Sequence, residues 1–236
     1  MKKTDIPMLA DYSQYFDLDC YLFDVVSRRY RQFKTLSVFD FFCIVIWKAN
    51  RAKSNVAKRL LKRGHASLEK SVEALFHNLA DCDSSRSRFE CLIYGWGFRL
   101  PMVSALLSVL YPEDFTVYDI RVCDQINDFH KLANISAKNK LWNGYCEFKQ
   151  RVSEFNAEGL SLTTLRDKDR YLWGKSFYEQ LRNDIDKKFE DLKDRKVIDK
   201  FEKREERGKV SFFSADEILT ASRKKKNRGK TPQNLK

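Results

Sequence analysis

The sequence lacks the cysteine and histidine patterns that bind metal ions. None of its six cysteines forms a C-x-x-C pair, and they are dispersed, most of them among apolar residues. Buried free thiols are the simplest explanation for such cysteines. The three histidines, His65, His77 and His130, lie far apart on different predicted helices. We therefore expect no zinc site, no other metal and no cofactor.

Long apolar runs and strand patterns are also missing. The longest purely apolar run, Phe41 to Trp47, is far too short to cross a bilayer. No secretory signal is present, so we expect a cytoplasmic protein with no membrane partner. Lys209 to Phe213 is the one candidate strand, and without a partner strand it is interpreted as an extended connector. These absences predict an all-α fold.

What the chain does have is an apolar fraction sufficient for a core and an excess of positive charge. Hydrophobic residues make up 43% of the sequence, and the net charge is +12. Such a composition indicates a folded, basic protein and favours a nucleic-acid partner. Residues Ala221 to Lys236 contain seven lysines and arginines and no acid. This tail is expected to be disordered, and a DNA-contacting arm and a solubilising terminus remain equal alternatives for it.

Apolar periodicity and caps predict helices along most of the chain, with breaks at glycines. A capping-box pattern, Ser214 to Glu217, opens the last predicted helix. The predicted helices are Tyr12 to Phe33, Val38 to Asn50, Asn55 to Lys62, Leu68 to Asp81, Ser85 to Ile93, Leu100 to Tyr111, Ile120 to Lys131, Ala137 to Asn156, Thr164 to Asp194 with interruptions, and Ala215 to Lys224.

The most informative stretch combines a glycine-rich turn, an apolar helix and a helix-opening aspartate. Gly95 and Gly97 permit positive φ and close approach of the backbone to a partner. The apolar helix Leu100 to Leu110 follows directly, and Arg99 lies beside its start. Backbone N–H groups and a helix dipole at such a position form a phosphate site that does not depend on base sequence. Asp119 then begins the next amphipathic helix.

These residues resemble the helix-hairpin-helix glycosylase superfamily, which contains endonuclease III and the adenine-mismatch and oxoguanine glycosylases. A gapless register places the hairpin at Gly95 to Arg99 and the catalytic aspartate at Asp119. The lysine that lyase members use falls on Pro101, and Arg99 stands in place of the second hairpin glycine. Weaker similarity covers Trp47-Lys48 and Leu165 to Lys175. No counterpart exists for the cysteine cluster that holds iron and sulfur in endonuclease III.

The resemblance implies two helical lobes with the active-site cleft between them. Residues 1–207 would form the bilobal glycosylase domain, residues 208–220 a connector with a short capped helix, and residues 221–236 the basic tail.

The resemblance also implies a role for Asp119. Cleavage of the bond between deoxyribose C1′ and a base develops oxocarbenium character, which a nearby carboxylate stabilises. The carboxylate can also orient or deprotonate an attacking water. An ordinary helix N-cap is the alternative, because aspartate is favoured at that position. The two roles are compatible.

Other residues are candidates for binding the flipped base and the DNA backbone. Trp47, Lys48 and Trp173 are expected to hold the base, although core packing explains the tryptophans as well. Lys48 is interpreted first as a base or phosphate contact and second as an amine nucleophile. Arg51 and Arg121, with Gly95, Gly97 and Arg99, are the expected DNA contacts.

Because Pro101 carries no amine, we expect a monofunctional DNA glycosylase that acts as a monomer on double-stranded DNA. Two alternatives stay open: a helix-hairpin-helix DNA-binding protein without catalysis, and a glycosylase/lyase that acts on endogenous damage. The segments at Trp47-Lys48, Gly95 to Pro101 and Tyr118 to Arg121 also resemble small bacterial anti-phage glycosylases. That resemblance implies a bulky substrate such as glucosylated hydroxymethylcytosine in phage DNA.

Overall fold

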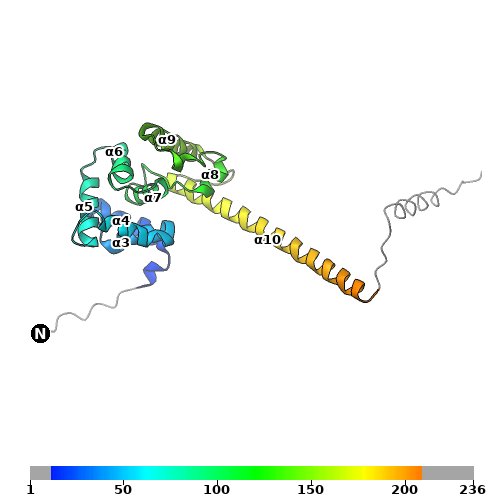
Figure 1. Cartoon of the computed structure of the whole chain (residues 1–236). Helices are drawn as coiled ribbons and strands as arrows, with labels where there is room; N and C mark the ends of the chain where they lie inside the picture. Colours follow the sequence, from blue (N-terminus) through cyan, green and yellow to red (C-terminus); the bar gives the residue numbers. More distant parts are fainter. Residues whose placement is uncertain (1–11, 209–236) are drawn as a thin grey trace, which may run out of the picture. The chain divides into compact units, whose positions relative to one another are not determined.

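The computed structural model of the chain describes residues 12–208, which consist of helices and connecting loops without a β-strand (Figure 1). The all-α prediction is therefore confirmed for this part of the chain. The chain divides into two compact units, Met1–Glu179 and Gln180–Lys236. The first unit holds nearly all the helices together with the start of the last helix.

The α-helices are numbered in chain order. They are α1 (Leu18–Cys20), α2 (Ser27–Phe33), α3 (Val38–Ala49), α4 (Lys53–Leu61), α5 (Leu68–Ala80), α6 (Ser85–Glu90), α7 (Leu100–Leu110), α8 (Ile120–Ile126), α9 (Lys138–Glu154) and α10 (Leu165–Glu206). Two π-helical segments, Tyr21–Val26 and Cys91–Gly95, and three short 3₁₀ segments, Tyr12–Tyr15, Asn50–Ala52 and Leu132–Asn134, complete the set.

Serine side chains begin several of these helices. Ser37 and Ser67 each accept a hydrogen bond from the backbone N–H three residues later, at the start of α3 and α5. Ser84 begins α6 with a reciprocal capping box that it shares with Ser87. These hydroxyls satisfy N–H groups that have no partner inside a helix, which fixes where each helix begins.

The apolar helix α7 lies at the centre of the first unit. All of its residues except Pro101 are buried. It packs against α2, α3 and α6, where α3 contributes Phe41, Ile44 and Val45 to the same core (Figure 1). A helix that is apolar on every side requires such surroundings, because a solvated face would expose hydrophobic surface. The predicted buried helix Leu100 to Leu110 is confirmed.

Three predicted helix boundaries are wrong. The first predicted helix is interrupted at Phe16 and Asp17, between a 3₁₀ turn and α1. Helix α8 ends at Ile126 rather than Lys131, because Asn127 adopts a left-handed conformation with φ of 52°. Helix α10 runs without interruption to Glu206 rather than ending near Asp194.

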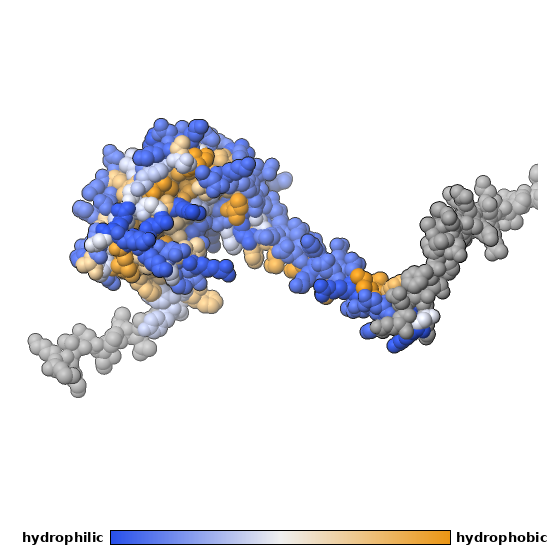
Figure 2. All heavy atoms as spheres, in the orientation of Figure 1, coloured by the Kyte–Doolittle hydropathy of each residue, from blue (hydrophilic) through white to orange (hydrophobic). Residues whose placement is uncertain are grey.

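The face seen in Figure 2 is mainly hydrophilic, with apolar areas between the charged side chains. Large apolar side chains, among them Phe177, Ile185 and Phe189, are exposed along α10. None of the helices within residues 12–208 is long and apolar enough to cross a membrane. The predicted connector Lys209 to Phe213, the capping box at Ser214 to Glu217 and the basic tail lie outside the described residues.

Candidate active site

A buried, extended segment delivers Asp119 to the start of α8. Residues 115–118 are buried and run between α7 and α9. The Tyr145 hydroxyl on α9 donates to the carbonyl of Thr116 at 2.7 Å and accepts from its N–H at 3.1 Å. Ser104 on α7 accepts a hydrogen bond from the N–H of Tyr118 at 2.9 Å. Side chains of two helices therefore fix the backbone immediately before Asp119.

The Asp119 carboxylate has two different partners. Its Oδ1 accepts the N–H of Arg121 at 3.0 Å, which makes Asp119 the N-cap of α8. Its Oδ2 lies 2.6 Å from Nζ of Lys48, on α3. Lys48 also donates to the carbonyl of Tyr118 at 3.0 Å. The predicted cap is present, and the second carboxylate oxygen is paired with an amine from a helix 71 residues away in sequence.

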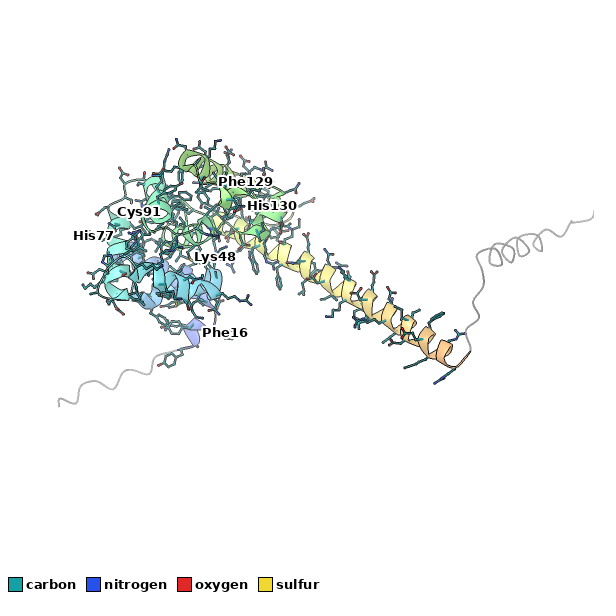
Figure 3. All side chains as sticks on the ribbon, viewed as in Figure 1. Phe16, Lys48, His77, Cys91, Phe129 and His130 are labelled. Carbon is teal, nitrogen blue, oxygen red and sulfur yellow. The ribbon has the colours of Figure 1, made fainter. Side chains whose placement is uncertain are left out.

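Lys48 is an interior residue. Its side chain is 9% exposed, against 23% for Asp119. Figure 3 labels Lys48 within the helical body, whereas Phe16 and His77 lie toward its edge. An ion pair this far from bulk water has less solvent screening than a surface pair. The pairing fixes the position of the carboxylate, and it fixes the amine equally.

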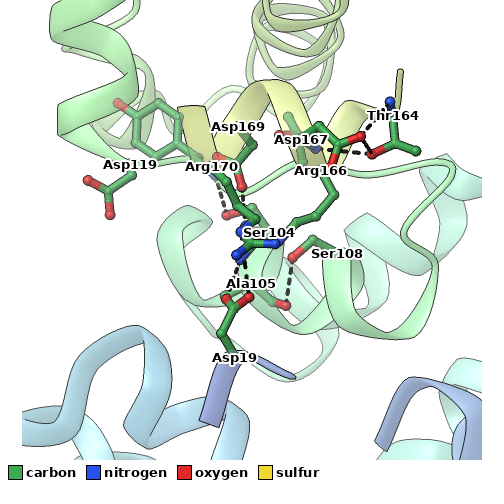
Figure 4. A network of polar contacts seen from close by, with 12 residues as sticks. Asp19, Ser104, Ala105, Ser108, Asp119, Thr164, Arg166, Asp167, Asp169 and Arg170 are labelled. Atoms are coloured by element: carbon green, nitrogen blue, oxygen red, sulfur yellow. Dashed lines mark hydrogen bonds and ion pairs between the residues drawn. The ribbon is translucent and has the colours of Figure 1, made fainter. Parts of the chain in front are cut away.

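The start of α10 forms a second wall, in which Arg166 is the central residue. Its guanidinium bonds to Asp19 on α1 and to Asp169 one turn later on α10 (Figure 4). The same guanidinium lies over the rings of Phe23, at 4.3 Å, and Trp47, at 5.2 Å. Arg166 therefore ties the first and last helices of the unit together beside Trp47.

Asp169 is a buried carboxyl with one strong partner. Its side chain is 4% exposed and bonds to Arg166. Burial raises the pKa of the Asp169 carboxyl to about 6, although the positive charges of Arg166 and Lys48 lower it. The negative charge of Asp119 raises this pKa further. Asp169 and Asp119 therefore interact electrostatically across one site.

Trp173 and Arg121 complete the site. The guanidinium of Arg121 lies 5.2 Å from the Trp173 ring and 5.5 Å from the Phe177 ring, and the two rings stack on each other. Nη1 of Arg121 is buried and has no hydrogen-bond partner among the described residues. Trp173 is 43% exposed, so it is not a core residue.

These side chains surround one cavity of about 450 Å³. Aromatic, acidic and basic groups share its wall, and its size falls within the range of small-molecule sites. The lining residues are Asp19, Trp47, Lys48, Val117, Asp119, Arg121, Arg166, Asp169, Arg170 and Trp173.

The structure brings together five of the residues predicted from sequence: Trp47, Lys48, Asp119, Arg121 and Trp173 all line the cavity. The other predicted contacts lie elsewhere. Arg51 is exposed in the 3₁₀ turn after α3, and the hairpin residues precede α7.

The hairpin differs in detail from the sequence prediction. Gly97 has a positive φ of 70°, whereas Gly95 has no positive φ and ends the π-helical segment. The N–H groups of Trp96 and Phe98 donate to carbonyls of that segment, at 2.8 and 3.0 Å. Two hairpin amides are therefore occupied within the chain rather than presented to a partner. Arg99 is exposed at the N-cap position, immediately before α7.

Sequence reasoning missed the acidic and basic residues of the second wall. An i, i+3, i+4, i+7 spacing places side chains on one helix face, and it is followed by Arg166, Asp169, Arg170 and Trp173. That spacing, within the stretch already compared with glycosylases, was a usable signal. Asp19 had no local signal, because its partner Arg166 is 147 residues away.

No cluster of three or more potential metal-binding His, Cys, Asp or Glu side chains occurs among residues 12–208. All six cysteines are free thiols. Only Cys43 and Cys123 are buried, so the expectation of burial holds for those two, while Cys20 is exposed.

Comparison of the chain with models of known protein families, with curated proteins and with solved structures finds no match. The candidate function therefore depends on the geometry of the site and on the sequence motifs.

Proposed function

We propose that the protein is a monofunctional DNA glycosylase with Asp119 as its catalytic carboxylate. The observation that carries the proposal is the position of Asp119 on the wall of a cavity that also holds Trp47, Lys48 and Trp173. A carboxylate fixed by a backbone N–H and by an ammonium is preorganised, so little reorganisation is needed when positive charge develops nearby.

In the proposed reaction a nucleotide leaves the DNA stack and its base enters the cavity, where aromatic rings contact its face. The bond between C1′ and the base nitrogen breaks, and the electron pair leaves with the base. Asp119 stabilises the positive charge on the sugar. A water oxygen then bonds to C1′, and the proton that the water loses passes by way of the Asp119 carboxylate to the departing base. The products are a free base and an abasic site in double-stranded DNA.

Lys48 has a positioning role in this proposal. Its ammonium contacts the carboxylate oxygen that is not used for capping, so the Asp119 side chain has one defined orientation. Because both carboxylate oxygens have partners, the Asp119 side chain is held at the cavity wall and does not rotate toward solvent.

The proposed substrate is a bulky modified cytosine such as glucosylated hydroxymethylcytosine in phage DNA. A sugar-bearing base needs room and several hydrogen-bonding groups. The cavity of about 450 Å³ is lined by the charged side chains of Asp19, Arg121 and Arg170. Carboxylate oxygens accept bonds from sugar hydroxyls, and guanidinium N–H groups donate to them.

One observation favours a second candidate function, a glycosylase/lyase. The Lys48 amine lies at the cavity and touches the proposed catalytic carboxylate. An amine at that position is available for Schiff-base chemistry at C1′ once it is deprotonated. The N-cap bond of Asp119 is equally consistent with a DNA-binding protein that performs no catalysis.

Abasic-site detection on glucosylated phage DNA separates these candidates. The glycosylase proposal predicts aldehyde-reactive sites after incubation with the purified chain, in strands that stay intact until they are treated with alkali. Prompt strand breaks indicate the lyase. Absence of abasic sites, with retained DNA binding, indicates the non-catalytic protein.

A further inference from the structure

A second cavity, of about 580 Å³, lies between α4 and the hairpin that precedes α7. Four basic side chains surround it: Lys58 and Arg59 from α4, Lys62 from the C-cap position of α4, and Arg99 from the hairpin. Phe98 and Met102 contribute apolar surface to the same cavity. No acidic residue is among its lining residues, which distinguishes it from the cavity at Asp119.

Helical spacing explains why these cations gather there. Lys58 and Lys62 are four residues apart, so they lie on the same side of α4, with Arg59 beside them. The apolar residues Val56 and Leu60 of α4 are buried against the core. The side of α4 that faces away from the core is therefore basic.

Arg59 lies directly over the hairpin. Its guanidinium is 5.9 Å from the ring of Phe98. A Cβ built at Gly97 would be 3.4 Å from Nη1 of Arg59. The guanidinium of Arg59 therefore lies beside the positive-φ glycine of the hairpin.

The four cations have no acidic partner in the described part of the chain. Within residues 12–208, Lys58, Arg59, Lys62 and Arg99 take part in no ion pair, and all four are exposed. The neighbouring Arg63 has a different role, since it donates to the carbonyl of Gly95 and lies 4.3 Å from the Trp96 ring. Four like charges around one cavity repel one another, and an anion placed among them removes that repulsion.

We propose that this cavity binds backbone phosphates of DNA through the side chains of Lys58, Arg59, Lys62 and Arg99. The inference rests on the proposed function for the identity of the nucleic acid. The hairpin amides of Trp96 and Phe98 are occupied within the chain, so α4 supplies side-chain cations for a phosphate contact.

The test is the salt dependence of duplex binding by the full-length chain. Binding of a fluorescent, unmodified DNA duplex is measured by anisotropy from 50 to 200 mM salt. The slope of log affinity against log salt is negative, and each lost phosphate contact reduces its magnitude by about 0.9. We expect the double variant Lys58→Gln/Lys62→Gln to reduce the magnitude of the slope by about 1.8, so that its binding depends less on salt. Its affinity should then fall about tenfold less than that of the unsubstituted chain over this salt range.

The matched control is Lys187→Gln/Lys188→Gln on α10, which removes the same net charge from two exposed lysines without ion pairs. Its slope should equal that of the unsubstituted chain. Glutamine and lysine have similar helix propensities, and thermal melting verifies the fold of both variants. An unchanged slope for the α4 variant, an equal decrease for the control, or no duplex binding at all overturns the inference.

The outcome is separable from that of the proposed function. Release of bases with an unchanged salt slope for the α4 variant contradicts the phosphate site alone. A decreased slope in a protein that releases no base contradicts the glycosylase proposal and leaves the phosphate site standing. An RNA duplex of the same length serves as a further comparison, and tighter binding of RNA than of DNA overturns the inference.

Discussion

The amine of Lys48 lies 2.6 Å from the carboxylate of Asp119. Lys48 is in the last turn of α3 and Asp119 is the N-cap of α8, so the two residues belong to helices that are far apart in sequence. The contact joins α3 to the start of α8 at the wall of the 450 Å³ cavity. While the ammonium is paired with the carboxylate it has no free lone pair, so attack on a sugar carbon would first require loss of a proton. The pair therefore supports a carboxylate mechanism in which the lysine positions the aspartate.

Lys48 provides the first prediction. The purified chain should leave abasic sites intact, and borohydride should trap no covalent protein–DNA product, because Pro101 has no amine and Lys48 is held by two oxygens. Lys48→Gln should slow base release and keep the DNA affinity, since the carboxylate loses its fixed orientation. Trapping by the unsubstituted chain that disappears in Lys48→Gln would instead identify a lyase.

The hairpin provides the second prediction. Gly97→Ala should lower the free energy of unfolding by roughly 1 to 2 kcal/mol, because a residue with Cβ is strained at positive φ. Urea denaturation measures this change. Gly95→Ala is the matched control, since Gly95 has no positive φ and its added Cβ would meet only Cys91 Sγ at 3.9 Å. Equal stability of the two variants would show that the turn geometry is wrong.

Asp169 provides the third prediction, which concerns pH. Its pKa of about 6 in the folded protein exceeds the ordinary value of 3.8, so the folded state binds this proton more tightly than the unfolded state. The contribution of Asp169 to stability therefore falls as pH rises from about 4 to about 6, by on the order of 3 kcal/mol.

Asp169→Asn should remove this contribution to the pH dependence. The measurement is the difference in melting temperature between the unsubstituted chain and the variant at a series of pH values from 4 to 7. The unsubstituted chain should lose stability relative to the variant as pH rises through this range. A difference that does not change with pH would contradict the raised pKa.

Local features of the sequence were sufficient for much of the fold. Apolar runs predicted α3 and α7, and serines marked the starts of α3 and α5. The end of α8 was not predicted, because it depends on Asn127 adopting a left-handed conformation, which residues other than glycine seldom adopt. The sequence also predicted interruptions in the last long helix, whereas α10 is continuous from Leu165 to Glu206.

The site was predictable only in part, because its central contacts join residues that are far apart in sequence. The resemblance to helix-hairpin-helix glycosylases pointed to Asp119, which lines the cavity. Its pairing with Lys48 and the pairing of Arg166 with Asp19 join residues 71 and 147 positions apart, and only the folded chain brings them together. The basic cavity at α4 was missed because lysines spaced like Lys58 and Lys62 occur on the solvated side of many helices. Only the folded chain brings Arg99 to the same cavity.

The central claim is that the Asp119 carboxylate catalyses base release from DNA. Asp119→Asn removes the charge and keeps a side chain that can cap α8. The control is Asp17→Asn, because Asp17 caps α1 by accepting the N–H of Cys20 at 3.1 Å and does not line the cavity.

The decisive measurement is mass spectrometry of the bases released by these three proteins from glucosylated phage DNA, damaged DNA and unmodified DNA. We expect the unsubstituted chain and Asp17→Asn to release the glucosylated base and to leave unmodified DNA intact. Asp119→Asn should bind the same DNA and release the base roughly a hundredfold to a thousandfold more slowly, the scale expected when a preorganised electrostatic group is lost. Release by Asp119→Asn at the rate of the unsubstituted chain, or no release from any of the DNAs, would contradict the claim.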